Sequence, residues 1–270
     1  MSENLKIGVA LGAGSARGWA HIGVLRALEK AGIRPQIICG ASIGALVGAV
    51  YAGEDLDALE EWVVGLTWRK VLGFFDVSFS GGFLKGARLI SFLRDNLLDK
   101  QVEDLALPFG AVATDLRSGR EIWLREGRAT DVVRASIALP GLFTPFDLDG
   151  RLLVDGALVN PVPVSLCRAM GADFVIGVDL GSSRTGRNVS DRRREYRPNM
   201  IEVVAESISI MQARITRSRL AGEPADALIM PQLGAIGSLD YHRAAESIKE
   251  GYVAAEMMLP QIRHLLASGD

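Results

Sequence analysis

The sequence predicts an α/β fold in which a mainly parallel central sheet carries helices on both faces. Three observations predict it. Short apolar runs alternate with helical patterns, a strand, tight turn and helix follow one another twice within the first fifty residues, and no linker rich in Pro, Gly or Ser divides the chain. At 270 residues, one large domain is the ordinary expectation, so we expect residues 1–270 to form a single domain.

The two strand-to-helix units open the chain. Residues 5–11 and 36–39 are short apolar runs that predict buried strands, and residues 19–30 and 43–51 have the residue patterns of helices. Residues 55–99 predict further helices with glycine interruptions. This region also holds an aromatic cluster that either packs as core or lines an acyl pocket, formed by Phe74, Phe75, Phe79 and Phe83.

The same alternation continues to the end of the chain. Strands are predicted at residues 108–114, 121–124, 152–154, 174–178 and 227–230, and helices at 131–137, around Cys167, at 200–220 and over 241–266 as one or two helices. Residues 182–199 are polar and rich in arginine. They predict a basic surface loop that is either simply solvated or steers an anionic lipid.

Composition limits the class of protein. Although 49% of the residues are hydrophobic and the mean hydropathy is +0.21, no apolar run reaches the roughly 18 residues that a membrane span needs, so only peripheral membrane contact is left open. A net charge of −2 gives no general attraction to nucleic acid. The chain has only two cysteines, both in apolar stretches, and we expect no secretory signal, so a cytoplasmic location fits. Such a protein could still contact the inner face of the membrane.

A glycine-flanked serine lies between the second predicted strand and the next helix. It has the G-x-S-x-G spacing, formed by Gly40, Ala41, Ser42, Ile43 and Gly44. In this context the two glycines permit a sharp turn that exposes a serine nucleophile at the start of a helix, whose dipole favours an anion. The alternative is a turn whose serine only caps the helix.

A glycine-rich loop joins the first predicted strand to the first helix and consists of Gly12, Ala13, Gly14, Ser15, Ala16, Arg17 and Gly18. A dinucleotide-binding fold would need an acidic residue at the end of the second strand, where the chain has Cys39 and Gly40, and the Gly-Lys-Ser/Thr of a nucleotide phosphate loop is absent. In a hydrolase, the loop's amides would stabilise an oxyanion. Arg17 either adds positive charge there or forms a structural ion pair.

An aspartate closes the predicted strand at 152–154 and is followed by Gly156 and Ala157. By itself, Asp155-Gly156 is a common turn. Together, the Gly12 to Gly18 loop, the turn around Ser42 and the Asp155-Gly156-Ala157 sequence occur in the order found in patatin-like phospholipases, and the chain resembles small bacterial members of that family related to the neuropathy target esterase domain. Ala113-Thr114-Asp115 and the segment from Arg134 to Gly141 agree with it. Ala41, Ala13 and Ser15 depart from residues common in that family.

The resemblance implies a patatin-like three-layer α/β/α fold and a catalytic dyad of Ser42 and Asp155, without a histidine. A serine needs a base within hydrogen-bond reach, and burial strengthens an aspartate as a base. Three other side chains are candidate bases for Ser42. Asp115 is a rival that otherwise caps a turn, and the triad order of α/β-hydrolases allows His242 or His264, both in predicted solvated helices. His21 is expected to be a packing or bracing residue at the first helix.

The resemblance further implies a lipid substrate, either a phospholipid or a lysophospholipid, or a simpler acyl ester. It implies no metal and no cofactor, and the chain independently lacks a His/Cys cluster with ligand spacing. Two function classes stay open: an acyl-ester hydrolase, and a regulatory or interaction protein that keeps this fold with little or no turnover. A nucleotide-binding oxidoreductase is disfavoured by the missing acidic residue. Oligomeric state, head group and chain-length preference are not predicted.

Overall fold

The computed structural model describes residues 5–74, 87–96, 98–181 and 200–268, and these residues contain an eight-stranded sheet. Its strands are β1 Ile7–Leu11, β2 Ile37–Ala41, β3 Phe109–Asp115, β4 Glu121–Leu124, β5 Phe146–Leu148, β6 Arg151–Asp155, β7 Phe174–Val178 and β8 Ala227–Ile229. Strands β1, β2, β3, β7 and β8 have apolar, largely buried sequences, as short strands covered on both faces require.

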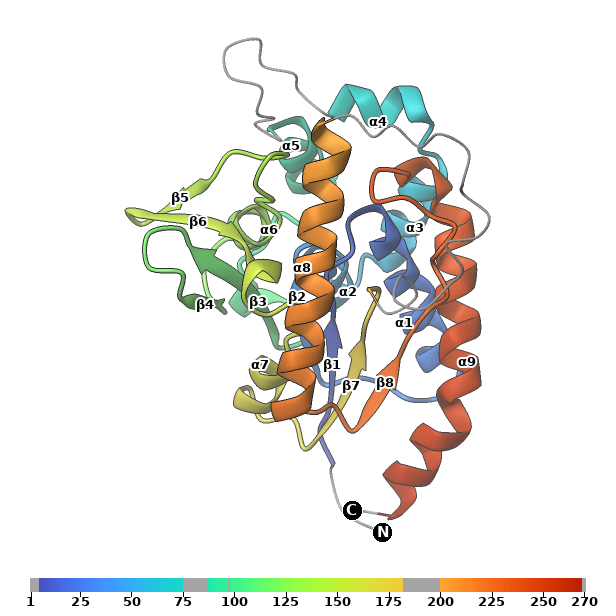
Figure 1. The fold of residues 1–270 in the computed structure, drawn as a ribbon. Helices are drawn as coiled ribbons and strands as arrows, with labels where there is room; N and C mark the ends of the chain where they lie inside the picture. Colours follow the sequence, from blue (N-terminus) through green and yellow to red (C-terminus); the bar gives the residue numbers. More distant parts are fainter. Residues whose placement is uncertain (1–4, 75–86, 97, 182–199, 269–270) are drawn as a thin grey trace.

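The sheet is mixed and mostly parallel. Strands β3, β2, β1, β7 and β8 lie side by side in parallel, while β4 and β6 pair antiparallel with β3, and β5 pairs antiparallel with β6. The antiparallel strands therefore gather at one end of the sheet (Figure 1). The parallel pairs are joined by crossovers that contain helices, as parallel strands require.

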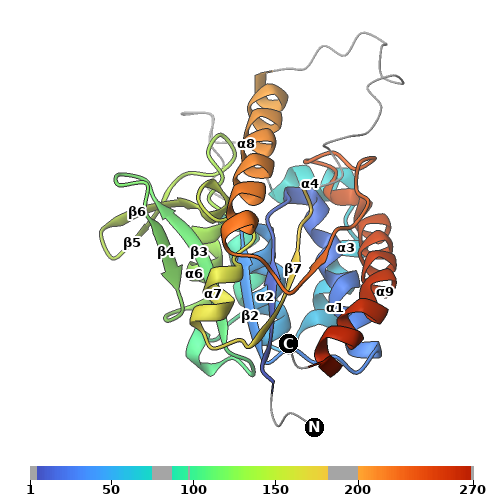
Figure 2. The same cartoon turned by 60° about the horizontal axis from the view of Figure 1, so that its bottom comes forward.

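Helices cover both faces of the sheet. They are α1 Ala20–Lys30, α2 Ile43–Ala52, α3 Leu56–Val64, α4 Trp68–Phe74, α5 Ala87–Asn96, α6 Ala129–Ser136, α7 Val164–Ala169, α8 Met200–Gly222 and α9 Ala244–Ser268. Figure 2 shows α7 and α8 on one side of β1 and β7, and α1, α3 and α9 on the other. This arrangement confirms the predicted α/β fold class.

Alternating strand residues divide the core between the two faces. Val9 and Leu11 of β1 join a large apolar cluster with α1, α2 and α9, whereas Ala10 between them joins a smaller cluster with α7. Ile38 likewise faces the large cluster and Cys39 the small one. This is the two-residue period of a strand that is buried on both sides.

Several predicted elements differ from the structure in extent. The first helix is preceded by a separate 3-10 helix, Ser15–Trp19, and the closing region is a 3-10 helix, Tyr241–Arg243, followed by one long helix, α9. Strand β5 is not predicted from the sequence, because three residues are too few to show a strand period. In the aromatic cluster, Phe74 ends α4 and the other three residues lie outside the described ranges, as does the arginine-rich segment 182–199.

Candidate active site

Two strands that run in opposite directions end against each other on one edge of β3. Strand β2 runs parallel to β3, with Ala41 opposite Val112, and β6 runs antiparallel, with Asp155 opposite Ala113. Both must share one edge, because β4 pairs with the same β3 residues on the other edge. The carboxyl ends of β2 and β6 consequently meet, which brings together residues that are 113 positions apart.

The turn after β2 has the geometry of a nucleophile elbow. Ser42 has a φ of +56°, a strained value for a residue other than glycine. A Cβ atom at Gly40 would lie 2.4 Å from Gly44 and Ala45 backbone atoms, and one at Gly44 would lie 2.2 Å from the Leu11 carbonyl oxygen. Only glycine fits at both positions, so the turn depends on the two flanking glycines.

A second serine holds this turn in place. The amide of Ser42 donates to Ser136 Oγ at 2.9 Å, and Ser136 Oγ donates to the Val112 carbonyl at 2.7 Å. Ser136 is fully buried at the end of α6. It lies in the segment on which the family resemblance partly rests, but nothing in its spacing pointed to this contact.

Ser42 and Asp155 are directly hydrogen bonded. Ser42 Oγ donates to Asp155 Oδ2 at 2.6 Å, and the amide of Ala157 donates to Asp155 Oδ1 at 2.8 Å. Asp155 is fully buried, and this desolvation raises the pKa of its carboxyl from 3.8 to about 7, although the two hydrogen bonds oppose the shift. Asp155 therefore lies within hydrogen-bond distance of the Ser42 hydroxyl, and its carboxyl can accept a proton near neutral pH.

Gly156 allows this close approach of β6 to β3. A Cβ atom at Gly156 would lie 2.1 Å from the Val112 carbonyl oxygen. The same carbonyl accepts the Ser136 hydrogen bond that holds the Ser42 turn. The glycine after Asp155 thus lets both strand ends lie against one point of β3.

The amides of the glycine-rich loop are not all available for an oxyanion. Those of Gly12 and Ala13 donate to the Val178 and Pro161 carbonyls, that of Ala16 donates to Ser238, and that of Arg17 donates to Gly14. Gly18 lies inside the 3-10 helix. Within the described part of the chain, the amides of Gly14 and Ser15 have no such partner. These two amides are therefore the loop donors that remain available to a bound acceptor, and the predicted oxyanion role of the loop stays a prediction.

The other loop contacts are structural. Arg17 is buried, and its Nε donates to the Gly14 carbonyl at 3.3 Å, so its side chain braces the loop. His21 Nε2 lies 2.7 Å from the Gly12 carbonyl oxygen. Burial lowers the pKa of His21 to about 4, so the ring is neutral at pH 7 and donates to that carbonyl. Of the two roles expected for His21, packing or bracing, this hydrogen bond indicates bracing, and the braced segment is the loop.

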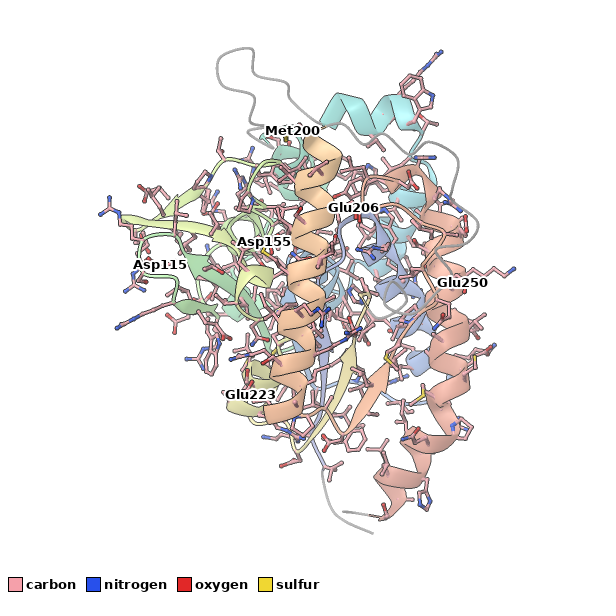
Figure 3. The ribbon with its side chains drawn as sticks, in the orientation of Figure 1. Asp115, Asp155, Met200, Glu206, Glu223 and Glu250 are labelled. Carbon is pink, nitrogen blue, oxygen red and sulfur yellow. The ribbon has the colours of Figure 1, made fainter. Side chains whose placement is uncertain are left out.

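The structure does not place the alternative bases near Ser42. Asp115 is half-buried and accepts hydrogen bonds from the Arg117 and Ser118 amides, so it caps a turn beyond β3. Figure 3 shows Asp115 on the outer, β4 side of the sheet, with Asp155 between it and α8. His242 and His264 are both exposed, and neither lines the pocket that contains Ser42.

A pocket of about 270 Å³ opens at Ser42. Gly14 and Ser15 also line it, and most of its wall consists of apolar side chains from α3, α4, α5, α8 and residues 137–143. Three of the apolar lining residues are also exposed to solvent, namely Met200 (76%), Leu239 (40%) and Val204 (39%). The pocket therefore joins the Ser42 hydroxyl to an apolar wall whose rim reaches solvent.

The C-terminal third contributes pocket residues that the sequence analysis did not identify. Tyr241 lines the pocket, and its hydroxyl lies 2.7 Å from Ser15 Oγ. Ser238 also lines it, and its Oγ is buried with no hydrogen-bond partner among the described residues. No local pattern marks either residue, because their proximity to Ser42 arises only from the packing of the chain.

The sequence profile of the family described as patatin-like phospholipase matches residues 9–168, which include both Ser42 and Asp155. The chain belongs to the patatin-like phospholipase family. Among its relatives in that family is an uncharacterized NTE family protein of Mycobacterium tuberculosis, 32% identical over 96% of this chain and 92% of the relative.

Other similar proteins are longer than this chain or resemble it only in structure. The human patatin-like phospholipase domain-containing protein 6 is 37% identical over 65% of this chain, which corresponds to 13% of the human protein. VipD from Legionella pneumophila has a similar structure, with a TM-score of 0.61 and 14% identity over 96% of this chain and 67% of VipD. This last likeness supports the patatin-like fold alone.

The described residues form neither a membrane-spanning helix nor a cluster of metal ligands. None of the described helices has the length and apolar character needed to cross a membrane. Across the same ranges, no three His, Cys, Asp or Glu side chains gather as a metal-binding group would.

Proposed function

We propose that the protein is a serine acyl-ester hydrolase that acts on lipid esters through a dyad of Ser42 and Asp155. The observation that carries the proposal is the 2.6 Å hydrogen bond from Ser42 Oγ to the buried Asp155 carboxylate, on a serine that lines an apolar pocket. Membership of the patatin-like phospholipase family supports lipid hydrolysis in general.

Acylation begins when Ser42 Oγ attacks the ester carbonyl carbon and Asp155 Oδ2 takes the serine proton. The new C–O bond converts the carbonyl oxygen to an oxyanion. In this proposal the amides of Gly14 and Ser15, which line the pocket and have no acceptor among the described residues, donate to that oxyanion. Collapse of the intermediate breaks the bond to the alkoxide, which leaves as an alcohol with the proton held by Asp155.

In deacylation a water molecule replaces Ser42 as the nucleophile, and Asp155 again serves as the base. Asp155 takes a proton from a water molecule, whose oxygen attacks the acyl carbon attached to Ser42. The same two amides stabilise the second oxyanion. When this intermediate collapses, Ser42 Oγ takes back the proton from Asp155 and the carboxylic acid is released. A pKa of about 7 suits Asp155 to both transfers, because the group gains and loses a proton near neutral pH.

The pocket supports a lipid acyl chain as the part of the substrate that it binds. Its wall is mainly apolar, and burial of each CH2 group against such a wall contributes about 0.8 kcal/mol. We propose phospholipids or lysophospholipids as substrates. The exposed rim residues Met200, Val204 and Leu239 would let the pocket mouth lie against a lipid surface without a membrane span.

Labelling with a fluorophosphonate probe tests the nucleophile directly. We expect one label per folded wild-type chain, none on Ser42→Ala, and labelling at least about 100-fold slower on Asp155→Asn, because the serine loses its base. Asp115→Asn and His242→Ala are matched controls and should label at the wild-type rate. If folded wild-type protein stays unlabelled, the hydrolase proposal fails and a regulatory or interaction role on the same fold replaces it.

Substrate class is tested separately with the active protein. Release of fatty acid is measured from vesicles of diacyl phospholipid, from lysophospholipid and from a water-soluble short-chain ester. A lipid hydrolase should turn over at least one of the two lipids with a higher kcat/KM than the short ester, because the longer chain buries more apolar surface. A clear preference for the short ester would reject the lipid substrate and retain the hydrolase.

A further inference from the structure

The segment from Ser238 to Tyr241 makes three hydrogen-bond contacts with the glycine-rich loop and the residues just before the first helix. The Ser238 carbonyl accepts from the Ala16 amide at 3.1 Å, the Tyr241 carbonyl accepts from Trp19 Nε1 at 3.2 Å, and the Tyr241 hydroxyl lies 2.7 Å from Ser15 Oγ. This segment follows α8 and lies outside residues 9–168, the part of the chain that matches the family profile. A distant part of the chain therefore fixes the loop that lies beside Ser42.

Ser15 is the loop residue with most need of such support. Its φ is +53°, in the left-handed region that favours glycine over residues with a Cβ. The same residue offers one of the two amides that have no acceptor within the described ranges. Any relaxation of Ser15 toward a more favourable φ would rotate this amide, so the direction of the N–H depends on what holds the residue.

The Tyr241 hydroxyl is not needed to hold Tyr241 itself. The Tyr241 ring packs edge-on against the Trp19 ring with centroids 6.1 Å apart, and its carbonyl accepts the Trp19 hydrogen bond. Desolvation raises the pKa of the Tyr241 phenol, which keeps the hydroxyl neutral at neutral pH and able to bond Ser15 Oγ. Removal of this oxygen alone would therefore loosen Ser15 while the ring stays in place.

We propose that Tyr241 is a positioning residue, whose hydroxyl holds Ser15 in its left-handed conformation so that the Ser15 amide points at the oxyanion. The proposal rests on the hydrolase function proposed above. It explains how a serine can occupy a loop position that suits glycine. Tyr241 acts through Ser15 and has no part in the proton transfer between Ser42 and Asp155.

A double-mutant cycle between Tyr241→Phe and Ser15→Gly tests the coupling. The rate constants for ester hydrolysis, the rate of fluorophosphonate labelling and the thermal midpoint are measured for wild type, both single variants and the double variant. We expect Tyr241→Phe to lower kcat and the labelling rate about 10-fold or more with KM little changed, because donation to the oxyanion matters in the transition state. Tyr252→Phe, at a tyrosine whose hydroxyl contacts Lys30 instead, is the matched control and should keep the wild-type rate.

The Ser15→Gly background separates positioning from a general structural effect. Glycine adopts a left-handed φ without help from a side chain. Whatever rate Ser15→Gly has, loss of the Tyr241 hydroxyl in that background should change it less than twofold.

Three outcomes decide the proposal. A Tyr241→Phe variant as fast as wild type overturns it, and so does an equal loss in both backgrounds, which would mean that Tyr241 acts independently of Ser15. Wild-type protein that takes no label defeats the hydrolase function itself, and this inference falls with it.

Discussion

Replacement of Asp155 with asparagine should stabilise the fold at alkaline pH although it removes the proposed base. The carboxyl is fully buried, and its pKa is raised to about 7 because burial penalises the charge. Above pH 7 the folded protein therefore carries a buried carboxylate. Asparagine is uncharged and its Oδ1 can still accept from the Ala157 amide. The substitution removes the charge and keeps this contact.

The sign and size of the effect follow from the two pKa values. The unfolded chain has an aspartate with the ordinary value of 3.8, so between that pH and about 7 the folded state holds a proton that the unfolded state has lost. A raised carboxyl pKa makes wild-type stability fall as pH rises, by about 1.4 kcal/mol per unit, and the loss is complete near pH 7. This loss of wild-type folding stability amounts to about 2 kcal/mol at pH 5 and about 4 kcal/mol at pH 8.

Urea unfolding at pH 5 and pH 8 measures this difference. Asp155→Asn should exceed wild type in free energy of unfolding at pH 8, and the excess should shrink by about 2 to 3 kcal/mol at pH 5. Asp115→Asn is the control. Hydrogen bonds from the Ser118 amide and hydroxyl lower the pKa of Asp115, so this variant should gain no stability at pH 8. An Asp155→Asn variant that is no more stable than wild type at pH 8, or equally favoured at both pH values, refutes the claim of a penalised buried charge.

Three further predictions concern catalysis and the turn around Ser42. The labelling rate of Ser42 should be level above pH 7 and fall about tenfold per unit below it, since only ionised Asp155 accepts the proton; a flat profile from pH 5 to 8 contradicts this. Gly44→Ala should lower the free energy of unfolding by at least about 2 kcal/mol and abolish most of the labelling, because its Cβ would meet the Leu11 carbonyl. Gly65→Ala is the control: its Cβ would have no contact under 3.4 Å, so the loss of stability in the same urea unfolding assay should be small. Ester turnover should survive dialysis against a chelator, and a loss that calcium restores would reject metal independence.

The sequence predicted the features that depend on residues near one another in the chain. Alternating apolar runs and helical patterns predicted the α/β class, and the fold confirms it. The glycine spacing around Ser42 predicted a sharp strand-to-helix turn, which the structure contains with a φ of +56° at the serine. The family resemblance, carried by three short motifs in order, is confirmed by the family profile over residues 9–168. Such patterns are local, because steric limits on a turn act over a few residues.

Tertiary structure decided the features that depend on distant residues. The ends of β2 and β6 meet only because both strands pair with one edge of β3. Carbonyls of distant residues accept from the amides of Gly12, Ala13 and Ala16, whereas those of Gly14 and Ser15 have no acceptor among the described residues. Tyr241 reaches Ser15 across 226 positions. The raised pKa of Asp155 likewise comes from its burial, and no motif encodes burial, because the atoms that exclude water from a carboxyl come from the whole chain.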